Sequence, residues 1–115
     1  MAIDLSDEAS VTSGVADLRA RTEAIDLLVN CAGLDARSFG LAKDHSGVFD
    51  VDAATFNAVL NVNVTGPMAL TREALPLLRA GTDPMILNIS SQLASMQALL
   101  NSLGNNTSQT IPGRV

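Results

Sequence analysis

Several residue types that carry chemistry in other proteins are missing or rare in this chain. Its 115 residues include no tyrosine and no tryptophan, and aromatic residues make up 3% of the sequence. No phenol is therefore available as a proton donor. Cys31 is the single cysteine, which excludes an internal disulfide bond and fits a reducing compartment. We expect Cys31 to be a small buried filler rather than a reactive thiol.

Cations are scarce as well, and they are not clustered. The formal net charge is −5, and the cations are one lysine, Lys43, and scattered arginines. Nucleic-acid binding needs clustered cations, so this pattern argues against a nucleic-acid partner and likewise against a membrane surface. No apolar run approaches the roughly 20 residues of a membrane span, and the N-terminus lacks the pattern of a signal peptide. We therefore expect a cytoplasmic protein.

His45 is the only histidine, and it lies in a polar segment beside Lys43 and Asp44. No second histidine or cysteine accompanies it at ligand spacing, so we predict a solvated His45 and no metal site. A Ser-His-Asp hydrolase built on Ser91 and His45 is formally conceivable. No Gly-x-Ser-x-Gly elbow frames the serine, however, and this argues against it.

Apolar residues are abundant, at 47% of the chain, and they alternate between strand-length runs and helical patterns. The expected elements are the end of a strand at 2–5, a helix capped by Ser6 and ending near Thr22, a strand at 25–29, a helix at 53–79 capped by Asp52, a strand at 85–89 and a weak helix at 92–103. Residues 104–115 read as an irregular tail. Strands alternating with helices imply right-handed crossovers, so we predict one α/β domain with a parallel sheet over 1–115.

Polar clusters follow the expected strands. Ligands bind at the carboxyl ends of strands in such sheets, so these clusters mark one candidate site. Asn-Cys-Ala-Gly at 30–33, Asn-Val-Thr-Gly at 63–66 and Asn-Ile-Ser-Ser at 88–91 stand in an order and spacing that resemble the short-chain dehydrogenase/reductase family. Any one of these tetrapeptides alone would be read as a local turn or a solvent-facing polar segment. Their joint occurrence favours the functional interpretation.

The resemblance covers residues 2–96 and implies a Rossmann-like, doubly wound parallel sheet. The sheet is incomplete here, with counterparts of the family's strands three, four and five and of its long crossover helix. The resemblance also implies NAD or NADP as the cofactor and a small carbonyl or alcohol substrate. Asn-Asn-Thr-Ser at 105–108 is similar to a segment of the C-factor and sniffer-like carbonyl reductases that precedes their catalytic tyrosine.

Cofactor contacts are implied by the same resemblance. Asp4 looks like the acid that accepts a hydrogen bond from the adenine amino group, with the Leu5 main chain beside it. Asn30, Ala32 and Gly33 look like the turn that passes over the cofactor ribose, where a residue without a bulky side chain lets backbone and ligand approach.

Catalytic roles are implied for two residues. Asn63 resembles the family's active-site asparagine, and Ser91 resembles the serine that hydrogen-bonds the substrate carbonyl oxygen. Pro67 has no N–H and cannot bond the carbonyl four residues back, which is that of Asn63. We therefore expect a kink and a free Asn63 carbonyl, which in the family is implied to hold a water of the proton relay.

Parts of the family pattern are missing. No glycine-rich turn precedes Asp4, no tyrosine occurs, and no lysine follows Ser91. In the doubly wound order 3-2-1-4-5-6, a strand at 2–5 would have no neighbour to pair with. We therefore expect a fragment of a larger domain. Alone it would be marginally folded or would need a partner, and it would be inactive because a positioned proton donor is absent.

A second hypothesis stays open, in which the chain is a degenerate, non-catalytic family member that acts by association. The helix at 53–79 would then supply an apolar seam of Phe56, Val59, Met68 and Leu75 to a homo-oligomer or to a partner. A well-folded dimer that ignores nucleotide would favour this hypothesis, whereas an aggregating chain would favour the fragment.

Overall fold

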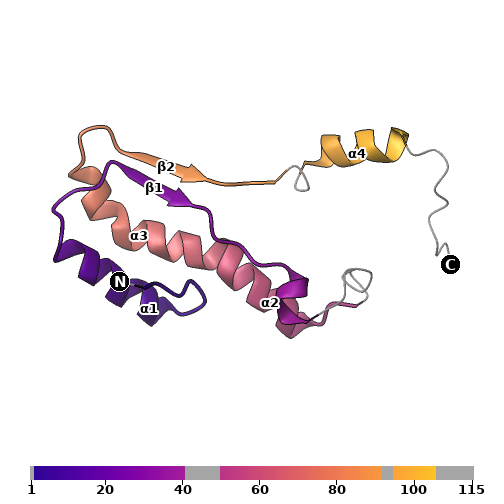
Figure 1. Ribbon diagram of the computed structural model, residues 1–115, viewed down its shortest axis with the longest axis horizontal. Coiled ribbons are helices and arrows are strands. Elements are labelled where there is room, and N and C mark those ends of the chain that lie inside the picture. The colour runs from indigo at the N-terminus through magenta and orange to yellow at the C-terminus, as the bar shows by residue number, and fades with distance from the viewer. Residues whose placement is uncertain (1, 41–49, 92–94, 106–115) are drawn as a thin grey trace.

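The computed structural model describes residues 2–40, 50–91 and 95–105 of the chain (Figure 1). Helices and strands alternate along it. The elements are α1 (Glu8–Arg19), β1 (Leu27–Asn30), the short 3-10 helix η1 (Ala36–Phe39), α2 (Ala53–Leu60), the π-helical turn η3 (Asn61–Thr65), α3 (Gly66–Arg79), β2 (Met85–Asn88) and α4 (Met96–Asn105).

A two-stranded parallel sheet forms between β1 and β2, with Leu27 opposite Met85 and Asn30 opposite Asn88. The crossover between the strands runs through α2, η3 and α3. The predicted α/β class and the parallel direction are therefore confirmed. The predicted strand at 2–5 is wrong, because in the described part of the chain no strand lies beside these residues to pair with them. The Asp4 N–H instead donates to Ser10 Oγ at 2.9 Å, which turns the chain toward α1.

The first helix begins one residue later than its sequence predicts. Asp7 is the N-cap, and its side chain accepts a hydrogen bond from the Ala9 N–H at 3.0 Å. Ser6 is not the cap because its hydroxyl donates to Asp4 Oδ1 at 2.7 Å. The helix ends at Arg19, with Ala20 as the C-cap, rather than near Thr22.

The core of the described residues lies between α1 and α3, which pack side by side (Figure 1). Its apolar side chains come from both helices, and they are Val11, Val15, Ala69, Ala74, Leu77 and Leu78. Val11 and Val15 lie one helical turn apart, as the periodicity of α1 predicts. Two of these six positions are alanines of α3, whose small side chains leave room for α1 to pack against it.

The long helix expected at 53–79 is not a single α-helix. Asp52 caps its start, as predicted, by accepting a hydrogen bond from the Thr55 N–H at 2.7 Å. The π-helical turn η3 interrupts it, and the Gly66 N–H bonds the Asn61 carbonyl five residues back. Pro67 follows directly and has no N–H for an α-helical bond to Asn63, which is the physical reason for an irregularity at this point.

The C-terminal elements differ modestly from their predicted bounds. β2 ends at Asn88 rather than at residue 89, and α4 covers Met96–Asn105. The helix thus includes Gly104 and Asn105, which were expected in an irregular tail. The predicted start of this helix at 92 and the remainder of the tail, 106–115, lie outside the described residues.

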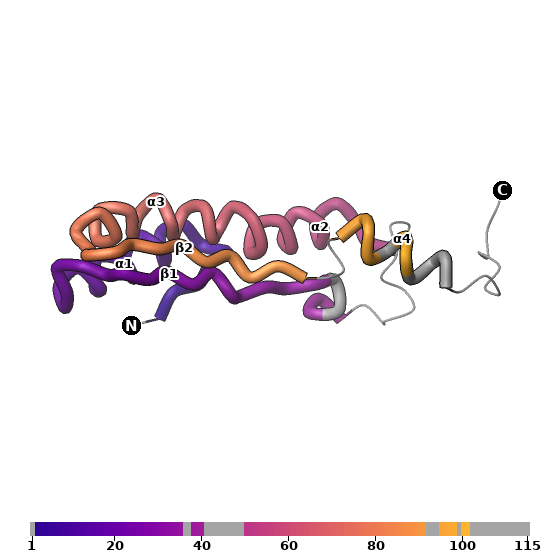
Figure 2. The backbone as a smooth tube through the Cα atoms, turned by 90° about the horizontal axis from the view of Figure 1, so that it is seen from above, coloured from indigo at the N-terminus to yellow at the C-terminus, as the bar shows by residue number. Residues whose placement is uncertain are grey.

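No element among the described residues covers one face of the sheet, and we call this face the bare face. It is the face turned away from α3, since the Asn30 side chain on the other face reaches Thr71 of α3. Alternation along the strands places five apolar residues on it, Leu27, Val29, Met85, Leu87 and Ile89, each between 43% and 58% exposed. Figure 2 shows both strands running alongside α3. In the part of the chain that the structure describes, no helix is both long and apolar enough to cross a membrane.

Candidate functional site

A groove between two loops and a helix is the central feature of the candidate site. The loop before α1 forms one wall, and the loop after β1 forms the other. The groove has a volume of about 680 Å3 and is lined by Ile3, Asp4, Leu5, Ser6, Ala32, Gly33, Leu34, Phe39, Ala58, Asn61 and Val62. Four of the five predicted cofactor residues therefore meet in one hollow, namely Asp4, Leu5, Ala32 and Gly33.

Asp4 presents a charged carboxylate at the first wall. Its Oδ1 accepts hydrogen bonds from the Ser6 hydroxyl at 2.7 Å and from the Ser6 N–H at 2.9 Å. These two bonds, the hydroxyl foremost, hold the pKa of the Asp4 carboxyl below its ordinary value. Because Asp4 is exposed, its carboxylate is ionised at neutral pH and accessible as a hydrogen-bond acceptor.

Asn63 holds the second wall in place. Its Nδ2 donates to the Leu34 carbonyl at 2.7 Å, and its Oδ1 accepts from the Leu34 N–H at 2.8 Å. This pair of bonds ties the loop after β1 to the π-helical turn. A Cβ added at Gly33 would lie 3.5 Å from Asn63 Oδ1, an ordinary contact, so the glycine keeps space open rather than relieving strain. That the Asn63 carbonyl lacks a helical hydrogen bond stays a prediction.

Asn30 points away from the groove, unlike its predicted companions. Its Nδ2 donates to Asn88 Oδ1 at 2.8 Å and to Thr71 Oγ1 at 3.3 Å, which links both strands to α3. The Ile89 N–H also bonds the Asn30 carbonyl at 2.9 Å. Asn30 Oδ1 is buried without a hydrogen-bond partner among the described residues. Asn30 thus fixes the ends of the two strands from which the adjoining loops leave.

Ser91 and Cys31 lie near the strand ends. Ser91 is exposed, three residues beyond β2, and is not part of the groove lining within the described residues. Its catalytic role stays a prediction. Cys31 follows β1 and is exposed, so the expectation of a buried filler is wrong. Alternation places it on the bare face, where the described residues supply no covering element.

Sequence reasoning missed Asn61 and Gly66, the two residues that hold the first wall of the groove in place. Asn61 Nδ2 donates to the Ser6 carbonyl at 2.8 Å, and Asn61 lies at the base of the groove. Gly66 is buried beneath the Leu5 main chain. The glycine was visible as the last residue of the Asn-Val-Thr-Gly tetrapeptide. Nothing in the local sequence distinguishes Asn61 from the neighbouring asparagines.

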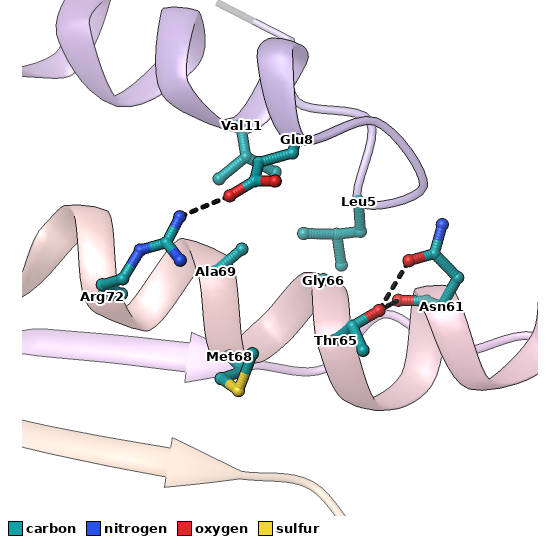
Figure 3. Close-up of a pocket in the computed structure, with 9 residues that line it drawn as sticks. All are labelled: Leu5, Glu8, Val11, Asn61, Thr65, Gly66, Met68, Ala69 and Arg72. Carbon is teal, nitrogen blue, oxygen red and sulfur yellow. Dashed lines mark hydrogen bonds and ion pairs between the residues drawn. The ribbon is translucent and has the colours of Figure 1, made fainter.

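A smaller hollow of about 200 Å3 lies behind the first wall, between α1 and α3 (Figure 3). An ion pair between Arg72 and Glu8, with 2.6 Å between nitrogen and oxygen, spans it. Leu5 and Asn61 line both this hollow and the groove. Among the described residues, no group of three or more histidines, cysteines or acids could hold a metal ion.

The predicted association seam is only partly exposed. Phe56 and Met68 are 55% and 61% exposed, whereas Val59 and Leu75 are half-buried. Association through the helix at 53–79 stays a prediction.

Known proteins resemble this chain over most of its length. Curated relatives include the short chain dehydrogenase/reductase dpchH of Colletotrichum higginsianum, 34% identical over 94 residues that cover 77% of this chain and 21% of that protein. The (+)-neomenthol dehydrogenase of Arabidopsis thaliana is 27% identical over 109 residues, which cover 86% of this chain and 37% of the relative. The chain therefore spans well under half the length of these relatives.

Solved structures agree with the sequence relatives. The complex of RhlG with NADP from Pseudomonas aeruginosa matches with a TM-score of 0.66 and 25% identity, covering 79% of this chain and 34% of that one. The fold is thus a Rossmann-like α/β fold of which this chain holds a part. The sequence matches the family described as short chain dehydrogenase over residues 1–103. The chain accordingly belongs to the short-chain dehydrogenase family.

Proposed function

We propose that this chain supplies the central, cofactor-facing part of an NAD(P)-dependent oxidoreductase that interconverts a small carbonyl compound and an alcohol. The observation that carries the proposal is the groove, in which Asp4, Leu5, Ala32 and Gly33 come together from two loops far apart in the sequence. The family resemblance of the sequence implies cofactor contacts for these same residues. Their meeting in one hollow is what a shared ligand requires.

The groove fits a nucleotide in size and in chemistry. Its volume of about 680 Å3 lies within the range of small-molecule sites, roughly 300–1,000 Å3. The ionised Asp4 carboxylate can accept a hydrogen bond from an adenine amino group. Ile3, Leu5 and Val62 offer apolar surface to a base or ribose, and Gly33 leaves room for close approach of a ligand.

The bound cofactor would supply or accept the hydride, and the protein would orient the reacting oxygen. Ser91 would donate a hydrogen bond to that oxygen. Asn63 would hold the second wall in a fixed position beside the reacting centre through its two hydrogen bonds to Leu34. Reduction also needs a proton on the oxygen, and this chain has no tyrosine to give it. We therefore infer that the chain alone has no turnover and functions within a larger domain.

The test is a titration of the purified chain with NADPH, followed by ligand-observed NMR. We expect weak, saturable binding, and Asp4→Asn should raise the dissociation constant about tenfold because a charged acceptor is lost. Asp17→Asn is the matched control, because Asp17 is exposed on α1 and lies outside the groove lining. Absence of saturable binding, or equal binding by the two variants, would contradict the proposal.

The fragment hypothesis has a separate test. Sequencing the DNA on both sides of the reading frame should reveal a coding region for a glycine-rich turn and for a tyrosine followed four residues later by a lysine. Flanks that lack both in every reading frame would contradict it.

A further inference from the structure

We propose that the π-helical turn η3 is a two-sided clamp that sets the width of the groove, with Asn61 as the positioning residue for the wall that carries Asp4. This inference rests on the proposed function, because the groove is its object. It concerns Asn61, Thr65 and Gly66, to which neither the sequence motifs nor the proposed chemistry gives a role.

Asn61 reaches the first wall with a fixed orientation of its amide. The Thr65 hydroxyl donates to Asn61 Oδ1 at 2.5 Å and also lies 3.0 Å from the Asn61 carbonyl (Figure 3). Since the amide oxygen faces a donor, the Nδ2 group faces the other way. It donates to the Ser6 carbonyl at 2.8 Å. Thr65 thus presents the donor of Asn61 to the Asp4–Ser6 loop.

Asn63 performs the corresponding task for the second wall, with two hydrogen bonds to the Leu34 main chain. Residues two apart on a helical turn point in different directions, so the two amides serve different loops. Asn61 and Val62 also form the base of the groove between those loops. One short turn therefore supplies the base and tethers both walls.

Gly66 completes the clamp by letting the first wall lie directly on α3. A Cβ at this position would overlap the Leu5 carbonyl oxygen and come within 2.8 Å of Leu5 Cβ. Figure 3 shows Leu5 directly above Gly66, with Asn61 and Thr65 beside it. The position of Asp4 relative to Gly33 thus depends on one helical segment. Loss of the Asn61 donor should release the Asp4 wall and leave the Gly33 wall held by Asn63.

The experiment compares Asn61→Asp with Asn57→Asp in the purified chain. Asn61→Asp preserves shape but removes the donor to the Ser6 carbonyl. Asn57→Asp places the same charge on exposed α2, one turn earlier. In Asn61→Asp, the Asp4 and Ser6 amides should exchange their hydrogens about fivefold faster, while the Leu34 amide keeps its rate. Thr65→Val, which frees the amide to rotate, should accelerate the same two amides by a smaller factor.

A binding measurement separates positioning from a general loss of structure. With AMP and nicotinamide mononucleotide as probes, Asn61→Asp should weaken AMP binding severalfold and leave mononucleotide binding unchanged. Unchanged exchange at Asp4 and Ser6, or equal acceleration at Leu34, would overturn the clamp. If the unaltered chain binds neither probe, the proposed function fails, yet the exchange rates still decide whether the clamp exists.

Discussion

Replacement of Gly66 by alanine tests whether the first wall of the groove lies directly on α3. Gly14→Ala provides a matched comparison. Both glycines are buried in helices, and both would place a Cβ against residues of the N-terminal segment. At Gly14 the nearest atoms are Cγ1 and Cδ1 of the Ile3 side chain, which must turn away for a Cβ to fit, and the Ala2 carbonyl oxygen lies 3.3 Å away. At Gly66 they include the Leu5 carbonyl oxygen, which moves only if the main chain moves.

The magnitudes follow from two opposing effects. Alanine is favoured over glycine inside a helix by about 1 kcal/mol, and both variants gain this amount. Overpacking costs about 1–3 kcal/mol where the surroundings are rigid. Gly14→Ala should therefore cost less than Gly66→Ala, because a side chain rather than the main chain has to move. Gly66→Ala should be less stable than Gly14→Ala by about 1–3 kcal/mol, with loss of the bond from Asn61 to Ser6.

Urea unfolding followed by circular dichroism at 222 nm measures the free energy of unfolding of each variant, provided that the transition is two-state. Hydrogen exchange at Ser6 shows whether the first wall has moved. If the Gly66→Ala chain is as stable as the Gly14→Ala chain and the Ser6 amide exchanges at an unchanged rate, the conclusion that Leu5 packs directly on α3 is refuted.

Three further predictions concern the second wall, the bare face and acid sensitivity. Asn63→Ala removes both hydrogen bonds to the Leu34 main chain, so it should lower the unfolding free energy by about 1–2 kcal/mol and accelerate hydrogen exchange of the Leu34 amide. An unchanged exchange rate would contradict the conclusion that Asn63 holds the loop after β1. Leu87→Lys on the bare face should reduce self-association in sedimentation experiments and change the unfolding free energy by no more than about 0.5 kcal/mol. Undiminished aggregation of this variant would show that the bare face does not cause self-association. The pKa of Asp4 is lowered in the folded chain, so its stabilising contribution is complete above its ordinary pKa and is lost as pH falls through the lowered value. Asp4→Asn should remove this acid-dependent component of the unfolding free energy. An unfolding free energy with the same pH dependence in both chains would contradict this prediction.

The sequence predicted the order and type of most elements because their signals are local. The run at 25–29 predicts a strand, which the structure places at Leu27–Asn30, and the spacing of Val11 and Val15 predicts the buried side of α1. The Asp52 cap was predicted correctly, since its partner is the N–H three residues later. Pro67 likewise predicted an irregularity in the helix expected at 53–79, although not its π-helical form.

Errors arose where a distant segment decides the outcome. The run at 2–5 has the composition of a strand, but a strand needs a neighbour, and none lies beside it among the described residues. The cap of α1 is an exception, because the bond that decides between Ser6 and Asp7 joins Ser6 to Asp4, only two residues away. Cys31 follows an apolar strand, yet nothing in the described chain covers that face.

The sequence by itself determined the family, the α/β class and four of the residues that line the groove, Asp4, Leu5, Ala32 and Gly33, because motifs and periodicity are properties of short segments. Tertiary structure alone decided that Asn30 turns toward Asn88 and Thr71, and that Asn63 holds Leu34 across 29 residues of sequence. It also decided that Asn61 reaches Ser6 across 55 residues. These hydrogen bonds depend on where the backbone of another segment passes, and no local pattern of residues encodes that position.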